Sequence, residues 1–142
     1  MPWDDHVEAH LTIDRADVQD GQVSIAGTTD LPTDAVLDYF FIHEGEMGDV
    51  TRSPRFQAGG QTRVRDGQYS SADGLSAWPD GDAVFDVWFE LGHDTSQPDH
   101  LVDRFGSRGQ CLAGPQVGVD SPGDPNVLRA AGSVTLSSTV DR

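Results

Sequence analysis

Two short apolar runs constrain the fold of this 142-residue chain more than any other feature. Residues 84–91 (Val-Phe-Asp-Val-Trp-Phe-Glu-Leu) alternate like a strand with one face buried. Residues 35–42 (Ala-Val-Leu-Asp-Tyr-Phe-Phe-Ile) are apolar on both faces except at Asp38, as in a strand at the centre of a sheet. Gly, Pro, Asp and Ser surround both runs, and no long helical period appears. The pattern therefore predicts an all-β domain.

Turn residues mark further strands around these runs. Asp20-Gly21 is a tight-turn signal, because glycine supplies the positive φ that a hairpin needs. The Pro-Asp-Gly-Asp sequence at residues 79–82 is a second turn signal. We expect strands at residues 9–14, 22–27, 35–43, 83–91 and 132–137. Alternation places in the predicted core Val23, Ile25, Leu37, Phe85, Phe89 and Val134.

The remaining segments carry weaker signals. Residues 50–56 and 61–64 are polar and are interrupted by Pro54 and Gly59-Gly60, so we expect short edge strands and long loops there.

A short helical turn is predicted over residues 98–104. Ser96 precedes it as an expected N-cap, with Asp99 in the first turn. Leu101, Val102 and Phe105 would then lie at the edge of the core.

The length indicates one domain spanning residues 1–142. Six to eight short strands separated by turn signals are typical of a β-sandwich, with a closed barrel as the alternative. The long segment between residues 91 and 132 favours the sandwich, because the loops of a sandwich gather at its two ends.

The charge balance is strongly negative. There are 24 acidic residues against 9 basic ones, all arginine, for a net charge of −15. Such a field opposes binding to nucleic acid and to anionic lipid. Solubility, adaptation to high salt and a cationic partner are the explanations that we consider.

Cysteine and membrane signals are sparse. Cys111 is the only cysteine, so no disulfide is expected within the chain, and a half-buried structural thiol is the favoured interpretation. Residues 1–5 have no basic or apolar character of a signal peptide, which predicts either a cytoplasmic protein or a mature chain with an added Met. No apolar run reaches the ~18–20 residues of a membrane helix, so we expect no direct membrane insertion.

One stretch of the chain resembles a known family. Residues 23–32 (Val-Ser-Ile-Ala-Gly-Thr-Thr-Asp-Leu-Pro), followed after a gap by residues 35–37, are similar to bacterial immunoglobulin-like modules of secreted, lipoprotein and cell-surface proteins. The turn into residues 79–85 and the segment from Gln97 to Val117 extend the likeness over residues 8–118. The resemblance implies an immunoglobulin-like sandwich of about seven antiparallel strands with long loops, in an extracytoplasmic (periplasmic or cell-surface) setting. It carries no catalytic residue across, and the lipidation cysteine expected near the start of such modules is missing.

The histidines do not form a convincing metal motif. His6 and His10 are four residues apart, which brings two rings together on a helix, but this segment is predicted to be a strand and would separate them by about 13 Å. His93 and His100 flank a loop. We interpret these histidines as scattered surface residues and expect no metal ligand.

Oxygen-rich turns offer the only cofactor alternative. Asp80, Asp82 and residues 120–124 could pool carboxylates around Ca²⁺ at one end of a sandwich, although no EF-hand spacing is present. Ordinary turn chemistry is the favoured interpretation, so the expected cofactor is none, with Ca²⁺ as the alternative.

Signatures of catalysis are missing from the sequence. There is no Gly-x-Ser-x-Gly elbow, and Ala58-Gly59-Gly60 lacks the Lys-Ser/Thr ending of a phosphate loop. We expect no catalytic residues and no enzymatic activity.

The aromatic residues are the better clue to function. If Phe85 and Phe89 face the core, Trp88 faces outward, where Tyr39 or Phe40 of the neighbouring strand would join it. Trp and Tyr are enriched at binding hot spots. We therefore take Trp88, Tyr39 and Phe40 as interface candidates, unless a loop covers them.

These observations favour a non-enzymatic module that acts outside the cytoplasm by protein–protein association. One alternative is an accessory subunit of a larger assembly, such as a membrane complex or a virion surface. A second alternative is a small metal-dependent hydrolase that uses loop His and Asp residues.

Overall fold

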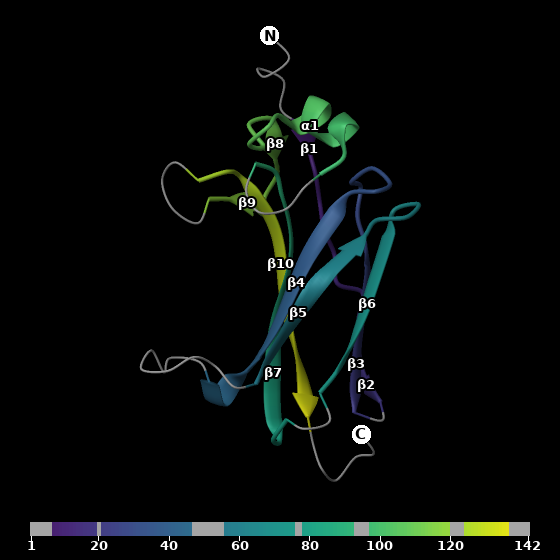
Figure 1. The fold of residues 1–142 in the computed structure, drawn as a ribbon, viewed down its shortest axis with the longest axis vertical. Helices are drawn as coiled ribbons and strands as arrows, with labels where there is room; N and C mark the ends of the chain where they lie inside the picture. The colour runs from purple at the N-terminus through teal and green to yellow at the C-terminus, as the bar shows by residue number, and fades with distance from the viewer. Residues whose placement is uncertain are drawn as a thin grey trace.

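The alternating apolar residues form two antiparallel sheets that share one core (Figure 1). The computed structural model describes residues 7–19, 21–46, 56–75, 78–92, 97–119 and 124–136. In the five-stranded sheet the order is β5 (Gln57–Arg63), β4 (Val36–His43), β7 (Gly81–Glu90), β10 (Val127–Leu136) and β9 (Val117–Gly118). In the three-stranded sheet the order is β2 (Arg15–Gln19), β3 (Gln22–Thr28) and β6 (Gln68–Gly74). The all-β expectation is confirmed.

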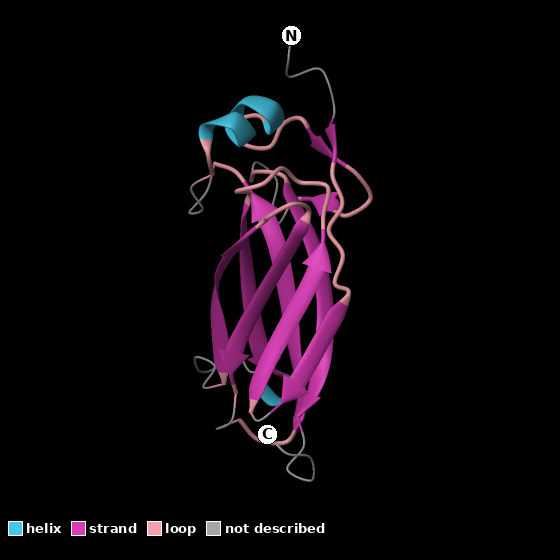
Figure 2. Ribbon diagram, turned by 90° about the vertical axis from the view of Figure 1, so that its right-hand side faces the viewer, coloured by secondary structure: helices cyan, strands magenta, loops and turns pink. Residues whose placement is uncertain are grey.

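Small elements close one end of the two sheets. β1 (Val7–Glu8) and β8 (Leu112–Ala113) pair in parallel, beside helix α1 (Asp99–Phe105) (Figure 2). This parallel pair was not expected from the sequence. A 3-10 helix, η2 (Glu44–Glu46), follows β4.

The predicted core is confirmed. All six expected residues are buried, with Phe89, Val23 and Leu37 fully inaccessible. Helix α1 buries Leu101 and Phe105, and the Phe105 ring meets Phe89 edge-on at 5.6 Å between centroids. The apolar side of the helix thus seals the end of the same core.

The hairpin at residues 20–21 is confirmed by strand pairing. Gln19 lies opposite Gln22, and Gly21 has a φ of 77°. A second Asp-Gly turn has the same chemistry: Asp66 and Gly67 have φ values of 51° and 77°, and an isolated bridge joins the residues on either side. This turn carries the chain from β5 in one sheet to β6 in the other.

The strand expected at residues 9–14 is wrong. That segment makes an isolated bridge at Leu11, and the N–H groups of Thr12 and Asp14 bond to β3, but the strand begins only at Arg15. A side chain binds the other edge of this segment. The Gln116 amide accepts a hydrogen bond from the Leu11 N–H at 3.0 Å and donates one to the Leu11 carbonyl at 2.6 Å.

The expected edge strands are confirmed in part, since residues 61–63 lie in an edge strand. Residues 57–63 form β5 and residues 68–74 form β6, each at the edge of its sheet, while residues 50–55 fall outside the described part of the chain. Gly59 and Gly60 do not interrupt β5 but lie within it. A Cβ on Gly59 would lie 2.7 Å from the Tyr39 carbonyl, and one on Gly60 would lie 2.8 Å from the Tyr39 hydroxyl. Glycine lets β5 approach Tyr39 closely.

Two smaller expectations need correction. The helix runs over Asp99–Phe105, with Pro98 at the N-cap and no side-chain capping bond; Ser96 lies outside the described residues. The last strand begins at Val127, five residues before the expected start, because its first residues pair with Glu90 and Phe89 of β7.

Candidate functional site

The outward side of the five-stranded sheet, which we call the outer face, brings together aromatic and acidic side chains. Register places Trp88 directly between Asp38 on β4 and Arg129 on β10. Phe40 lies opposite Asp86, and Ile42 lies opposite Val84. These β4 and β7 side chains are all half-buried. Trp88 and Phe40 thus share one face, as predicted.

Polar partners hold the Trp88 side chain. The Arg129 guanidinium lies over the indole ring at 5.9 Å from its centroid. The indole N–H donates a hydrogen bond of 3.4 Å to Glu90 Oε1. Across β4, the Gln61 amide donates to Asp38 at 2.9 Å. The indole therefore lies among charged side chains, in a setting suited to a partner that is partly apolar and partly polar.

A hollow of about 500 Å³ opens beside Phe40 on the same face. Its apolar side is formed by Phe40, Ile42 and Val84, and Asp86 brings a carboxylate to it. The side chains that β10 contributes are no larger than serine, which leaves room above them. The outer face therefore carries a recess as well as the Trp88 ring.

Tyr39 does not belong to the outer face. It lies opposite Val87, packs against the core and meets Phe41 edge-on. Burial raises the pKa of Tyr39, and the charge of Asp73 on β6 and a hydrogen bond to it add to the shift. Its polar partner is therefore inside the sandwich. The expectation that Tyr39 could join Trp88 is wrong, because successive residues of a strand point to opposite faces.

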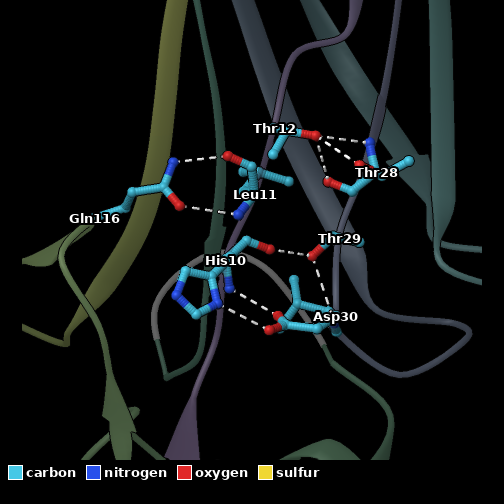
Figure 3. Close-up of polar contacts among 8 residues, drawn as sticks. His10, Leu11, Thr12, Thr28, Thr29, Asp30 and Gln116 are labelled. Carbon is cyan, nitrogen blue, oxygen red and sulfur yellow. Dashed lines mark hydrogen bonds and ion pairs between the residues drawn. The ribbon is translucent and has the colours of Figure 1, made fainter.

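His10 and Asp30 form a pair that spacing alone does not reveal (Figure 3). His10 Nδ1–H donates to Asp30 Oδ2 at 2.9 Å, and the His10 main-chain N–H donates to Asp30 Oδ1 at 2.7 Å. The hydrogen bond to Asp30 raises the pKa of His10 despite desolvation, and the charges of Asp30 and Glu8 add to it. Partial burial acts to raise the pKa of Asp30, but the bonds from His10 outweigh it and lower the pKa overall.

Threonine hydroxyls continue the network around this pair. Thr29 Oγ1–H donates to the His10 carbonyl at 2.6 Å, and the hydroxyls of Thr12 and Thr28 lie 2.7 Å apart (Figure 3). Every one of these bonds joins the segment before β2 to the segment at the end of β3. We interpret the His10–Asp30 pair as a structural contact that fixes the segment before β2 to the end of β3.

The other residues considered as metal ligands are not brought together within the described part of the chain. His6, His93 and residues 120–123 lie outside the described residues, and His100 is exposed on α1. Within the described ranges, no three His, Cys, Asp or Glu side chains gather as a metal site would require. Cys111 is buried rather than half-buried.

The buried His43 was not singled out by sequence reasoning. Its Nδ1 accepts a hydrogen bond from the Gly45 N–H at 3.0 Å, so Nε2 carries the proton and donates to the carbonyls of Pro79 and Asp80, each at 3.1 Å. The ring also packs near Phe56 and Trp78. These contacts give it a structural role in joining two loops.

Comparisons of the chain with protein-family models, with curated proteins and with solved structures found no match. Within the described residues, no helix has the length and apolar character needed to cross a membrane.

Proposed function

We propose that this chain is a non-enzymatic binding module of immunoglobulin-like type, which associates with a cationic protein through the outer face. The observation that carries the proposal is the gathering of Trp88, Phe40 and Ile42 with Asp38 and Asp86 on one face. The proposed extracytoplasmic setting rests on the sequence resemblance alone.

The strand order supports the immunoglobulin-like part of the proposal. In that fold, strands A, B and E form one sheet and strands C, F and G form the other, with C′ added beside C in some members. β2, β3 and β6 have the order A-B-E, while β5, β4, β7 and β10 have the order C′-C-F-G. The short β1, β8 and β9 would be additions to this plan.

The charges of the outer face favour a basic partner. Asp38, Asp86 and Glu90 surround the apolar residues, and the guanidinium of Arg129 is stacked over Trp88. A partner with an apolar centre and a lysine or arginine rim would complement this arrangement. A second copy of the chain would bring another net charge of −15 and the same carboxylates to the interface, so we propose a different protein as the partner.

Site-directed photocrosslinking in the producing cells tests the proposal. A benzoylphenylalanine at Ile42, on the outer face, should capture a partner. The same group at Ala72, which is exposed on the three-stranded sheet, is the matched control and should not capture it. The captured protein, identified and purified separately, should bind the wild-type chain more weakly as salt is raised.

Trp88→Ala then tests the central residue. Binding of the purified partner should weaken by more than tenfold, since a hot-spot aromatic contributes about 2 kcal/mol or more. The melting temperature should stay within a few degrees. The proposal would be overturned by any of three results. The group at Ala72 captures the same protein equally well, the group at Ile42 captures only a second copy of the chain, or Trp88→Ala binds the partner as tightly as the wild type does.

A further inference from the structure

Strand β10 has a free edge along most of its length. It pairs with β7 over all its residues, but with β9 only at Val127 and Leu128. The Arg129 N–H bonds to the Gln116 carbonyl on the β9 side, at 3.2 Å. Because main-chain direction alternates in an antiparallel ladder, Ala131, Ser133 and Thr135 also turn their N–H and C=O groups away from β7.

Those groups have no hydrogen-bond partner among the described residues. No strand pairs with β10 beyond Leu128 on that side, and no turn or loop bond reaches the main chain of Ala131, Ser133 or Thr135. All three residues are exposed. Water satisfies such an edge in a monomer, and an extended chain can replace the water.

This edge also lacks the features that usually block pairing. Residues 130–133 (Ala-Ala-Gly-Ser) contain no charge, no proline and no bulky side chain. Strand β2 lies beside β10 across the gap between the sheets without being paired to it in either sheet.

The hollow of the outer face lies next to this edge. Ala131, Gly132 and Ser133 line it together with Ile42 and Val84. A strand added to β10 would place alternate side chains on that face, where apolar ones could lean into the recess. The carboxylate of Asp86 in the hollow, and that of Asp82 beside Thr135, favour a basic residue between them.

We propose that the free edge of β10 binds an extended segment of the partner protein as an added β-strand. This inference rests on the proposed function and names the form of the partner at the same face. On the outer face, the segment presents apolar residues that fill the recess and a basic residue between Asp82 and Asp86, with polar residues at the alternate positions. It hydrogen-bonds to the main chain of Ala131 and Ser133. The edge strand β5 is the less suitable rival, because its outward side chains are polar and Thr62 already bonds to the Ser70 carbonyl on β6.

Nuclear magnetic resonance with a synthetic peptide provides the test. The probe is a blocked heptapeptide with valine and lysine at alternate positions, which share one face of a strand, and threonine at the positions between them. Two control peptides have the same sequence with every second amide N-methylated. One carries the methyl groups along the edge that would face β10, and the other carries them along the opposite edge. Titration should shift the amide signals of Ala131, Ser133 and Thr135 and slow their hydrogen exchange at least tenfold. Methylation in the register that faces β10 should abolish both effects.

A variant separates this inference from the proposed function. Ser133→Pro removes an N–H that points away from β7, so the ladder keeps its bonds. Gln61→Pro on the β5 edge, where the N–H also points outward, is the matched control. The inference predicts that Ser133→Pro weakens peptide binding and capture of the partner at least tenfold, while Gln61→Pro does not.

Loss of partner binding in Trp88→Ala but not in Ser133→Pro would overturn the added strand and leave the proposed function standing. Loss in neither variant would overturn both. Equal binding of all the methylated peptides, or no shift at Ala131 and Ser133, would also overturn the added strand. If Ser133→Pro does not fold, the methylated peptides decide.

Discussion

The outward faces of the two sheets differ although their inward faces build one core. On the five-stranded sheet, Trp88, Phe40 and Ile42 lie among carboxylates. On the three-stranded sheet the outward residues are small or polar: Ser24, Ala26, Thr28, Gln68, Ser70, Ala72 and Gly74. Inward positions are constrained by packing, whereas outward positions are free to vary with function.

Arginine makes the contrast sharper. Three of the nine arginines line a groove between β3 and β6 of the three-stranded sheet and β5 of the other sheet: Arg15, Arg63 and Arg65. Arg15 is paired with Asp17 at 3.1 Å and Arg65 with Asp34 at 3.4 Å, while Asp14 also lines the groove. Opposite charges therefore lie side by side there. The five-stranded face instead combines apolar area with an excess of acid, and this combination is what suits it to a basic partner.

The largest expected effect tests whether the two faces depend on one core. Phe89→Ala empties a fully buried aromatic site and should reduce the free energy of unfolding by about 3–5 kcal/mol. Urea unfolding followed by tryptophan fluorescence and by circular dichroism should give one shifted transition. Phe40→Ala, on the half-buried outer face, is the matched control with a smaller loss. Two separate transitions would show that the sheets are stabilised independently.

Salt should stabilise the protein, because the net charge of −15 repels itself. The melting temperature should rise by several degrees as NaCl goes from a few millimolar to roughly 0.1 M, where the Debye length is about 10 Å. Asp86→Asn on the acidic face should raise the melting temperature at low salt, and Arg15→Gln on the other face should lower it. If salt did not change the melting temperature of the wild type or of either variant, the expected difference in charge between the two faces would be contradicted.

The His10–Asp30 pair should make stability depend on pH. Because the pKa of His10 is raised on folding, its contribution is complete below the unfolded value of about 6.5 and is lost as pH rises through the folded value. Asp30 has a lowered pKa, so its share is complete above the usual 3.8 and is lost as pH falls through the folded value. Melting curves from pH 4 to 9 should show a decline above about pH 6.5. In His10→Gln this decline should be smaller; an unchanged profile would exclude the pair as its cause.

Only a small change in stability is expected for Trp88→Ala. Its ring packs on Arg129 rather than in the core, so the loss should be about 1 kcal/mol or less. Ser24→Ala on the opposite face should change stability by about 0.5 kcal/mol at most. Chemical unfolding measures both. A loss for Trp88→Ala that approached that of Phe89→Ala would place the ring in the core and remove the contrast between the faces.

Some features of the site could be predicted from local sequence. Alternation along residues 84–91 correctly put Phe89 inside and Trp88 outside, because a strand exposes side chains to its two faces in turn. The same rule, applied strictly to residues 39 and 40, would have separated Tyr39 from Phe40. The Asp66-Gly67 turn repeats the residue types of Asp20-Gly21, so that signal was present as well.

Contacts between segments far apart in the chain could not be predicted from local sequence patterns. His10 and Asp30 are 20 residues apart, and Gln116 reaches Leu11 across 105 residues. Neither pair belongs to a repeating pattern, since each depends on how loops are brought together after the sheets form.

The sequence by itself determined the all-β class, the hairpin at residues 20–21 and the six core residues tested. These follow from burial and turn geometry, which act over a few neighbouring residues. Only the tertiary structure decided which strands lie side by side and that β10 keeps a free edge. Those features depend on the pairing of segments far apart in the chain. The residues of one strand do not by themselves specify which strands will pair with it.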